Sequence, residues 1–117
     1  MKTFLAIFTA TPAKLDAWNR LEPSVRADRD KRALVAWNQW ATEHAAAIVD
    51  VGSPLGHTKR VSAAGTIDTA TTSAGYVLIR AESHDAAARI FADHPHFTLM
   101  PGDAVEVIEC LPLPSAG

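Results

Sequence analysis

The stretch GYVLIRAESHDAAARIFADHP, residues 75–95, decides the fold of this chain. It opens with the clearest strand of the sequence, in which Val77, Leu78 and Ile79 stand in a row. Ser83 is a natural N-cap for the helix that follows, and Pro95 requires that helix to stop near His94 because proline disfavours helical geometry in the preceding residue. The stretch therefore predicts a strand, a tight connection and an amphipathic helix.

The segment before this stretch predicts another strand and two helices. TFLAIFTA, residues 3–10, carries apolar side chains on both of its alternating faces and predicts a strand covered on both sides. Thr11 and Pro12 then favour a helix start, and we interpret residues 11–27 as a short helical insertion interrupted by Pro23. Residues 28–48 predict a long amphipathic helix from an apolar spacing of three and four that includes Leu34, Trp37, Ala41, His44 and Ile48.

Glycine and proline in VDVGSPLG, residues 49–56, predict the end of the long helix. KRVSAA, residues 59–64, follows as a short strand, and TIDTATTSA, residues 66–74, predicts a polar connection. A last strand is expected over residues 104–111, and residues 112–117 form a tail without periodicity. The order is strand, helix, strand, strand, helix, strand. It predicts one α+β domain over residues 1–117, a ferredoxin-like βαββαβ fold with a four-stranded antiparallel sheet and both helices on one face.

The second face of such a sheet has no cover within the chain. Because the strands are apolar on both faces, a bare face would expose a large hydrophobic surface to water. Packing that face on a second copy removes the exposure. The sequence therefore predicts a homodimer formed through the sheet.

Five segments together resemble the YCII-related proteins, small members of the dimeric α/β-barrel superfamily: MKTFLAIFTA (1–10), AWNQW (36–40), IVDVGSPLGHTKRVS (48–62), residues 75–95 and GDAVEVIECLPLP (102–114). The resemblance covers most of the chain. It implies sheet-to-sheet dimers, a small-molecule pocket between sheet and helices, and relatives that act on compact organic substrates. It also implies a histidine early in the first helix and an aspartate before the proline that ends the second. Here His94 precedes Pro95, Asp93 lies one step earlier, and the long helix offers Trp37, Asn38 and Trp40.

Charge and cysteine content exclude several classes of function. Eleven basic and thirteen acidic residues give a net charge of −2 without a run of one sign, which is not the pattern of a nucleic-acid binder. The N-terminal segment is too short to span a membrane. Cys110, the single cysteine, excludes an intrachain disulfide, and its apolar surroundings predict a buried thiol in a protein of the reducing cytoplasm.

His94 is the strongest candidate for a catalytic residue. At a helix C-terminus the unpaired carbonyls favour imidazolium, although His94 could equally act only as a cap. Asp93 is the candidate partner. His96 is expected to point elsewhere, and a lone His-x-His without a third ligand does not predict a metal site. We expect no cofactor.

The candidate ligand-binding residues are Trp37, Trp40, His57, Lys59 and Asp50. The tryptophans could form an apolar wall for a ring, with Trp37 the more buried and Trp40 the freer of the two. SPLGHTKR, residues 53–60, could close over an anionic group or be a tight turn with exposed charge.

Two functions of different class follow from these features. In the first, the protein is an enzyme with a His-based acid/base site that acts on a compact organic acid or lactone-like substrate. In the second, it is a non-catalytic homodimeric module that binds a ligand or a partner, and its histidines are structural.

Overall fold

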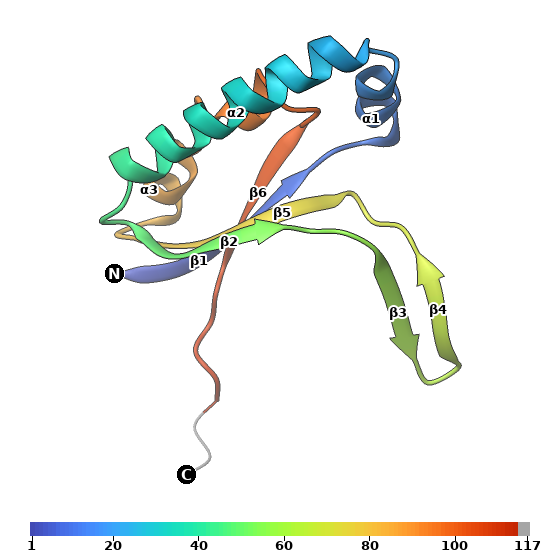
Figure 1. Cartoon of the computed structure of the whole chain (residues 1–117). Coiled ribbons are helices and arrows are strands. Elements are labelled where there is room, and N and C mark those ends of the chain that lie inside the picture. The colour runs from blue at the N-terminus through green and yellow to red at the C-terminus, as the bar shows by residue number, and fades with distance from the viewer. Residues whose placement is uncertain (115–117) are drawn as a thin grey trace.

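The computed structural model describes residues 1–114, and in it a curved sheet carries all three helices on one side (Figure 1). The elements along the chain are β1 (Lys2–Thr9), α1 (Pro12–Asn19), α2 (Pro23–Glu43), β2 (Ile48–Pro54), β3 (Thr58–Ser62), β4 (Gly65–Thr69), β5 (Ser73–Ala81), α3 (His84–Arg89), the single 3₁₀ turn η1 (Pro95–Phe97) and β6 (Ala104–Glu109). The predicted α+β class is confirmed.

The main sheet has four antiparallel strands in the order β2-β5-β1-β6. Strands β1 and β2 run parallel and are joined by a crossover through α1 and α2, and β5 and β6 run parallel and are joined by a crossover through α3. This gives the ferredoxin-like arrangement predicted from the sequence. Strand β1 is central and pairs with both β5 and β6, as in the register of Phe4 with Ile79 and with Glu109. The apolar side chains of β5 thus lie beside those of β1.

The core lies between this sheet and the helices. Side chains paired across β1 and β5 point to the same face, and on the helix side Phe4, Phe8, Val77 and Ile79 are at most 1% exposed. Trp40 of α2 packs into the same cluster, and its indole N–H donates to the carbonyl of Ile90 at 3.1 Å. Ser83 caps α3 as predicted, because its side chain accepts the N–H of Ala86.

The opposite face of the sheet carries a second apolar row without a helix over it. Leu5 is in register with Leu78 and with Ile108, and Ile7 is in register with Tyr76. Ile108 is 47% exposed and the other four are half-buried. The expectation of apolar side chains on both faces is therefore confirmed.

Residues 49–56 do not end a helix, and this part of the prediction is wrong. They belong to β2, the edge strand that pairs with β5 through two register irregularities, and to the residues just after it. Gly52 has a φ of 70°, and a Cβ at this position would lie 1.8 Å from the carbonyl oxygen of Tyr76. Asp50 accepts the N–H of Gly52 at 2.8 Å. Glycine and proline that stop a helix are also the residues found at bulges of edge strands, so the pattern was compatible with both structures.

Strands β3 and β4 form a separate hairpin, which we call the arm (residues 58–69). The sequence placed residues 59–64 in the main sheet and residues 66–74 in a connection, whereas β3 pairs only with β4. The arm leaves the sheet on the side away from the helices, and so does the segment after β6 (Figure 1). Of the predicted tail, residues 112–114 have no regular structure and residues 115–117 lie outside the described part.

The long helix begins and ends five residues earlier than predicted. Pro23 is its first residue rather than a break, because its fixed φ suits the first turn of a helix. Ala33 and Trp40 form the buried stripe with the half-buried Trp37, whereas Leu34 is 64% exposed. No helix within residues 1–114 is long and apolar enough to cross a membrane.

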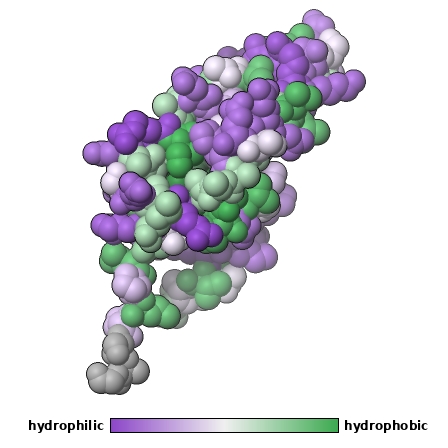
Figure 2. Space-filling model, turned by 90° about the vertical axis from the view of Figure 1, so that its left-hand side faces the viewer, coloured by the Kyte–Doolittle hydropathy of each residue, from purple (hydrophilic) through white to green (hydrophobic). Residues whose placement is uncertain are grey.

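Cys110 is exposed, so the prediction of a buried thiol is wrong. It lies one residue beyond β6, where the strand no longer packs beneath the helices. The surface seen in Figure 2 is mainly hydrophilic over its upper part, and apolar residues gather below, where the C-terminal segment leaves the body. Leu111 and Leu113 in this segment are 76% and 92% exposed.

Candidate functional site

The turn that carries His94 and His96 lies beneath α2. The helix predicted to reach His94 is regular only to Arg89, and irregular turns continue to Asp93. Pro95 holds His94 in an extended conformation, with φ −66° and ψ 142°. In this geometry Nδ1 of His94 accepts the backbone N–H of His96 at 3.0 Å and caps η1. The proline therefore turns both imidazoles toward the protein interior.

His94 is completely buried in a box of aromatic rings. The ring centroids of Trp37, Trp40 and Phe8 lie 4.4, 4.5 and 4.8 Å from that of the imidazole, and the two indoles stand nearly perpendicular to it. Burial lowers the pKa of His94 from about 6.5 to about 3, and the positive charges that His96 and His44 can carry add to this shift. The imidazole is therefore neutral at pH 7.

The hydrogen bond to Nδ1 fixes the tautomer of His94. Because Nδ1 accepts a hydrogen bond, it carries no proton, and the proton of the neutral ring is on Nε2. Nε2 is fully buried and has no hydrogen-bond partner within residues 1–114. A buried donor without an acceptor costs about 1–3 kcal/mol, so this atom is an unused binding group inside the fold.

His96 is 3% exposed, and its ring also packs against Phe8, at a centroid distance of 5.1 Å. Its Nε2–H donates to the carbonyl of Thr9, at a nitrogen to oxygen distance of 2.8 Å. Burial lowers the pKa of His96, while the carbonyls of Thr9 and Ala104 and the carboxylate of Asp103 act in the opposite direction. A Cβ on Gly102 would lie 2.3 Å from the ring of His96, so only glycine leaves room for the imidazole at this place.

A small cavity of about 90 Å³ opens beside His96, and we call it the inner cavity. It lies between α2, the ends of β1 and β2, and the start of β5. Its wall is apolar apart from the imidazole and Ser53, and consists of Phe8, Trp37, Ser53, Pro54, Ala74, Gly75, His96 and Met100. A water molecule takes up roughly 30 Å³ in the liquid, so the cavity is large enough for a small functional group or part of a ring.

The structure brings His94, Trp37 and Trp40 together, as the sequence predicted. The expected roles of the two indoles are reversed: Trp40 is buried against His94, and the half-buried Trp37 lines the inner cavity. Asp93 is exposed, and no hydrogen bond or ion pair within residues 1–114 joins it to His94. The carboxylate of Asp50 is used within β2, where it binds the N–H of Gly52.

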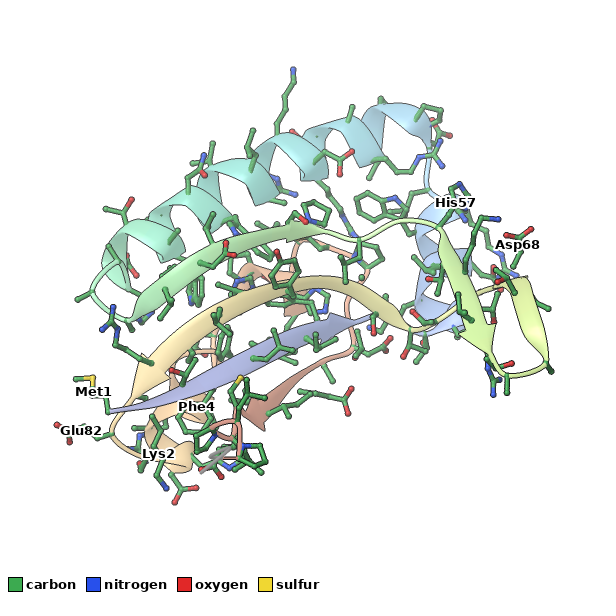
Figure 3. The ribbon with its side chains drawn as sticks, turned by 90° about the horizontal axis from the view of Figure 1, so that it is seen from below. Met1, Lys2, Phe4, His57, Asp68 and Glu82 are labelled. Carbon is green, nitrogen blue, oxygen red and sulfur yellow. The ribbon has the colours of Figure 1, made fainter. Side chains whose placement is uncertain are left out.

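His57 and Lys59 lie at the other end of the molecule. Figure 3 shows His57 and Asp68 at the arm, at the opposite end of the sheet from Met1, Lys2 and Phe4. Nζ of Lys59 is 2.7 Å from Oδ1 of Asp68, and both side chains are largely exposed. His57 lines an open groove between the arm and α1 rather than the inner cavity.

Sequence reasoning missed His96 as a residue of the cavity wall. The sequence analysis expected the side chain of His96 to point away from that of His94. The 3₁₀ turn instead directs both rings inward. Gly102 was the available signal in the sequence, because a glycine allows a side chain to approach the backbone closely, and here the ring of His96 does so. Within residues 1–114 no group of three histidine, cysteine, aspartate or glutamate side chains is placed to hold a metal ion.

The comparisons with known proteins show a fold likeness. No family model matches the chain, and a search of curated proteins finds no match. Among solved structures, the chain is similar to 5-chloro-2-hydroxyhydroquinone dehydrochlorinase (TftG) from Burkholderia phenoliruptrix AC1100, in complex with 2,5-dihydroxybenzoquinone. The two are 20% identical, the match covers 90% of this chain and 89% of the other, and the TM-score is 0.50. The likeness supports the α+β, ferredoxin-like class.

Proposed function

We propose that this chain is a small-molecule enzyme related to the YCII proteins, with its reaction centre at the inner cavity and a His-based site formed by His94 and His96. The proposed substrate is a compact organic acid or a lactone-like molecule. The observation that carries the proposal is the buried Nε2–H of His94, which has no acceptor within residues 1–114 and belongs to a ring packed against Phe8 and Trp37, two residues of the cavity wall.

A neutral imidazole at this position favours a particular chemistry. Its Nε2–H can donate to a carbonyl oxygen and stabilise the negative charge that develops there during proton transfer or elimination. Nearly complete exclusion of water strengthens that interaction. The other ring nitrogen, Nδ1, accepts the N–H of His96, so the ring would act on a substrate through the Nε2–H alone.

The substrate class is supported by the shape of the cavity and by the structural neighbour. The walls contributed by Phe8 and Trp37 are flat aromatic surfaces. TftG was solved with a hydroxylated quinone, a compact ring with several oxygens. The inner cavity is smaller than the roughly 300 Å³ at which small-molecule sites begin, so binding requires Trp37 or Met100 to move.

The test uses 2,5-dihydroxybenzoquinone, benzoate and γ-butyrolactone as probes, with tryptophan fluorescence to detect binding and chromatography to detect conversion. His94→Gln keeps a polar side chain but removes the imidazole, and His84→Gln changes an exposed histidine of α3 as a matched control. We expect His94→Gln to lose conversion while His84→Gln retains it. Equal conversion by wild type and His94→Gln would contradict the catalytic assignment.

The alternative is a non-catalytic homodimeric module that binds a ligand or a partner. The complete burial of His94 favours this alternative, since a histidine without access to solvent is often structural. Binding of a probe without conversion in wild type, and with an unchanged affinity in His94→Gln, would support it. A reducing cytoplasmic location fits both functions, because the single thiol of Cys110 is exposed and free.

We also propose that two copies associate through the uncovered face of the sheet. Leu5, Ile7, Tyr76, Leu78 and Ile108 form its apolar row. The arm and the C-terminal segment project on the same side, where a second copy would contact them (Figure 1). Sedimentation at micromolar concentration tests this. We expect twice the 12.5 kDa chain mass, and a monomer would contradict the proposed dimer.

A further inference from the structure

A second cavity shares the side chain of Met100 with the inner one. It has a volume of about 200 Å³ and opens between α1, α2 and the loop that follows η1. We call it the outer groove. The residues that matter for its chemistry are Lys14, Trp18, Arg29, Phe97 and Met100. The groove therefore combines two cations with two aromatic side chains.

The outer groove has a surplus of positive charge. No carboxylate contributes to its lining, and the half-buried Arg29 has no ion-pair partner within residues 1–114. The positive charge of Lys14 is partly neutralised by the nearby carboxylate of Asp103, which also accepts a hydrogen bond from the N–H of Thr11. A partly buried guanidinium without a counter-charge is a favourable site for an anionic oxygen.

Met100 lines both cavities. Methionine has three rotatable side-chain bonds and adapts its shape more readily than other apolar residues. A change of its rotamer would join the outer groove to the inner cavity. Together the two volumes come close to the roughly 300 Å³ at which small-molecule sites begin.

We propose that the two cavities form one binding site, closed by Met100, for a compact organic anion. The apolar body of the ligand lies in the inner cavity against Trp37, and its carboxylate lies in the outer groove with Arg29 and Lys14. This inference rests on the proposed function and adds to it the charge, the orientation and the route of the ligand. It assigns to Arg29 and Met100 roles that the sequence did not indicate.

Benzoate and its neutral isostere benzamide test the inference. Trp18 and Trp37 lie in the two compartments, so tryptophan fluorescence reports dissociation constants for both probes. We expect wild type to bind benzoate about tenfold more tightly than benzamide, as one charge-assisted contact would give. Arg29→Gln should remove this preference and leave benzamide binding unchanged.

Arg32→Gln is the matched control, because Arg32 lies on the same helix and is paired with Asp28 outside the groove. It should bind both probes as wild type does. Equal affinities for benzoate and benzamide in wild type, a preference that survives Arg29→Gln, or no binding of benzoate at millimolar concentration would each overturn the inference.

Met100→Ala tests the closure. Removing the side chain that lines both compartments should speed association of benzoate severalfold in stopped-flow fluorescence, and Met100→Leu should bind at nearly the wild-type rate. An unchanged rate in Met100→Ala would contradict a closing role.

The two proposals fail in different ways. If Arg29→Gln loses the benzoate preference but wild type converts none of the probes, the proposed anion site is supported and the proposed enzymatic function is contradicted. If conversion depends on His94 but not on Arg29, the proposed enzymatic function is supported and the proposed anion site is contradicted.

Discussion

The turn with His94 and the arm place polar residues in opposite environments, the first in the protein interior and the second in water. In the turn, His94 is fully buried against Phe8 of β1, and its hydrogen bond inside the protein decides which nitrogen carries a proton. In the arm, every residue of β4 is exposed, and Lys59 pairs with Asp68 in water. An isolated two-stranded hairpin is marginally stable. Packing within the chain therefore specifies the turn, whereas no part of residues 1–114 covers β4.

Glycine to alanine changes in the two regions give the largest contrast. Gly52→Ala should destabilise the protein by about 4 kcal/mol or more, because the new methyl group would overlap the carbonyl of Tyr76 at a positive φ. A Cβ on Gly56, next to the arm, would meet no other atom within 4 Å, so Gly56→Ala should change stability little. Urea denaturation measures both. Similar stabilities of the two variants would contradict the structure of β2.

Gly102→Ala tests the packing around His96 and should cost about 2–3 kcal/mol. The added methyl group displaces the imidazole from the carbonyl of Thr9 and leaves buried polar atoms unpaired. The check is a double-mutant cycle with His96→Ala, which removes the ring. In that background Gly102→Ala should cost much less, whereas additive effects would show that the ring is not the obstacle.

Acid should weaken the turn more than the arm. The folded pKa of His94, about 3, is below its unfolded value of about 6.5, so the unfolded state binds the proton more readily and stability falls as the pH drops below about 6.5. Between pH 7 and pH 5 the loss from His94 alone should be about 2 kcal/mol, and the lowered pKa of His96 acts in the same direction. His94→Gln should lose most of this dependence in urea titrations at the two pH values.

Lys59→Gln should have the smallest effect. Its ion pair with Asp68 is exposed on both sides, and such pairs contribute little to stability in water. We expect a denaturation midpoint indistinguishable from that of wild type. A clear loss of stability would show that the arm is packed against something, and a loss confined to concentrated samples would identify a second copy.

The sequence predicted the parts of the fold that local patterns control. The strand around Val77 to Ile79 and the cap at Ser83 each have a short-range physical cause, and the structure confirms them. The helix ends at Arg89, five residues before the predicted end at His94. The sequence did not predict β2, because the bulge at Gly52 depends on the neighbouring strand β5. A glycine next to a proline looks the same whether it ends a helix or bends an edge strand.

The site was predicted in part for the same reason. His94, Trp37 and Trp40 were singled out from one turn and one helix, and the structure brings them together. His57 and Lys59 are close to β2 along the chain, but the arm carries them away from the sheet. The inner cavity is formed by the ends of three strands and by Met100, and no short sequence pattern predicts that these segments lie side by side.

Nitrogen-detected NMR of the imidazoles tests the central claim most directly, that His94 offers a buried, unpaired N–H beside a ligand cavity. At pH 7 we expect His94 to be neutral with its proton on Nε2, and we expect that resonance to shift when benzoate is added. His84, which is exposed on α3, serves as the internal reference and should keep its shift. A charged His94, a proton on Nδ1, or an Nε2 resonance that does not move at saturating benzoate would contradict the account.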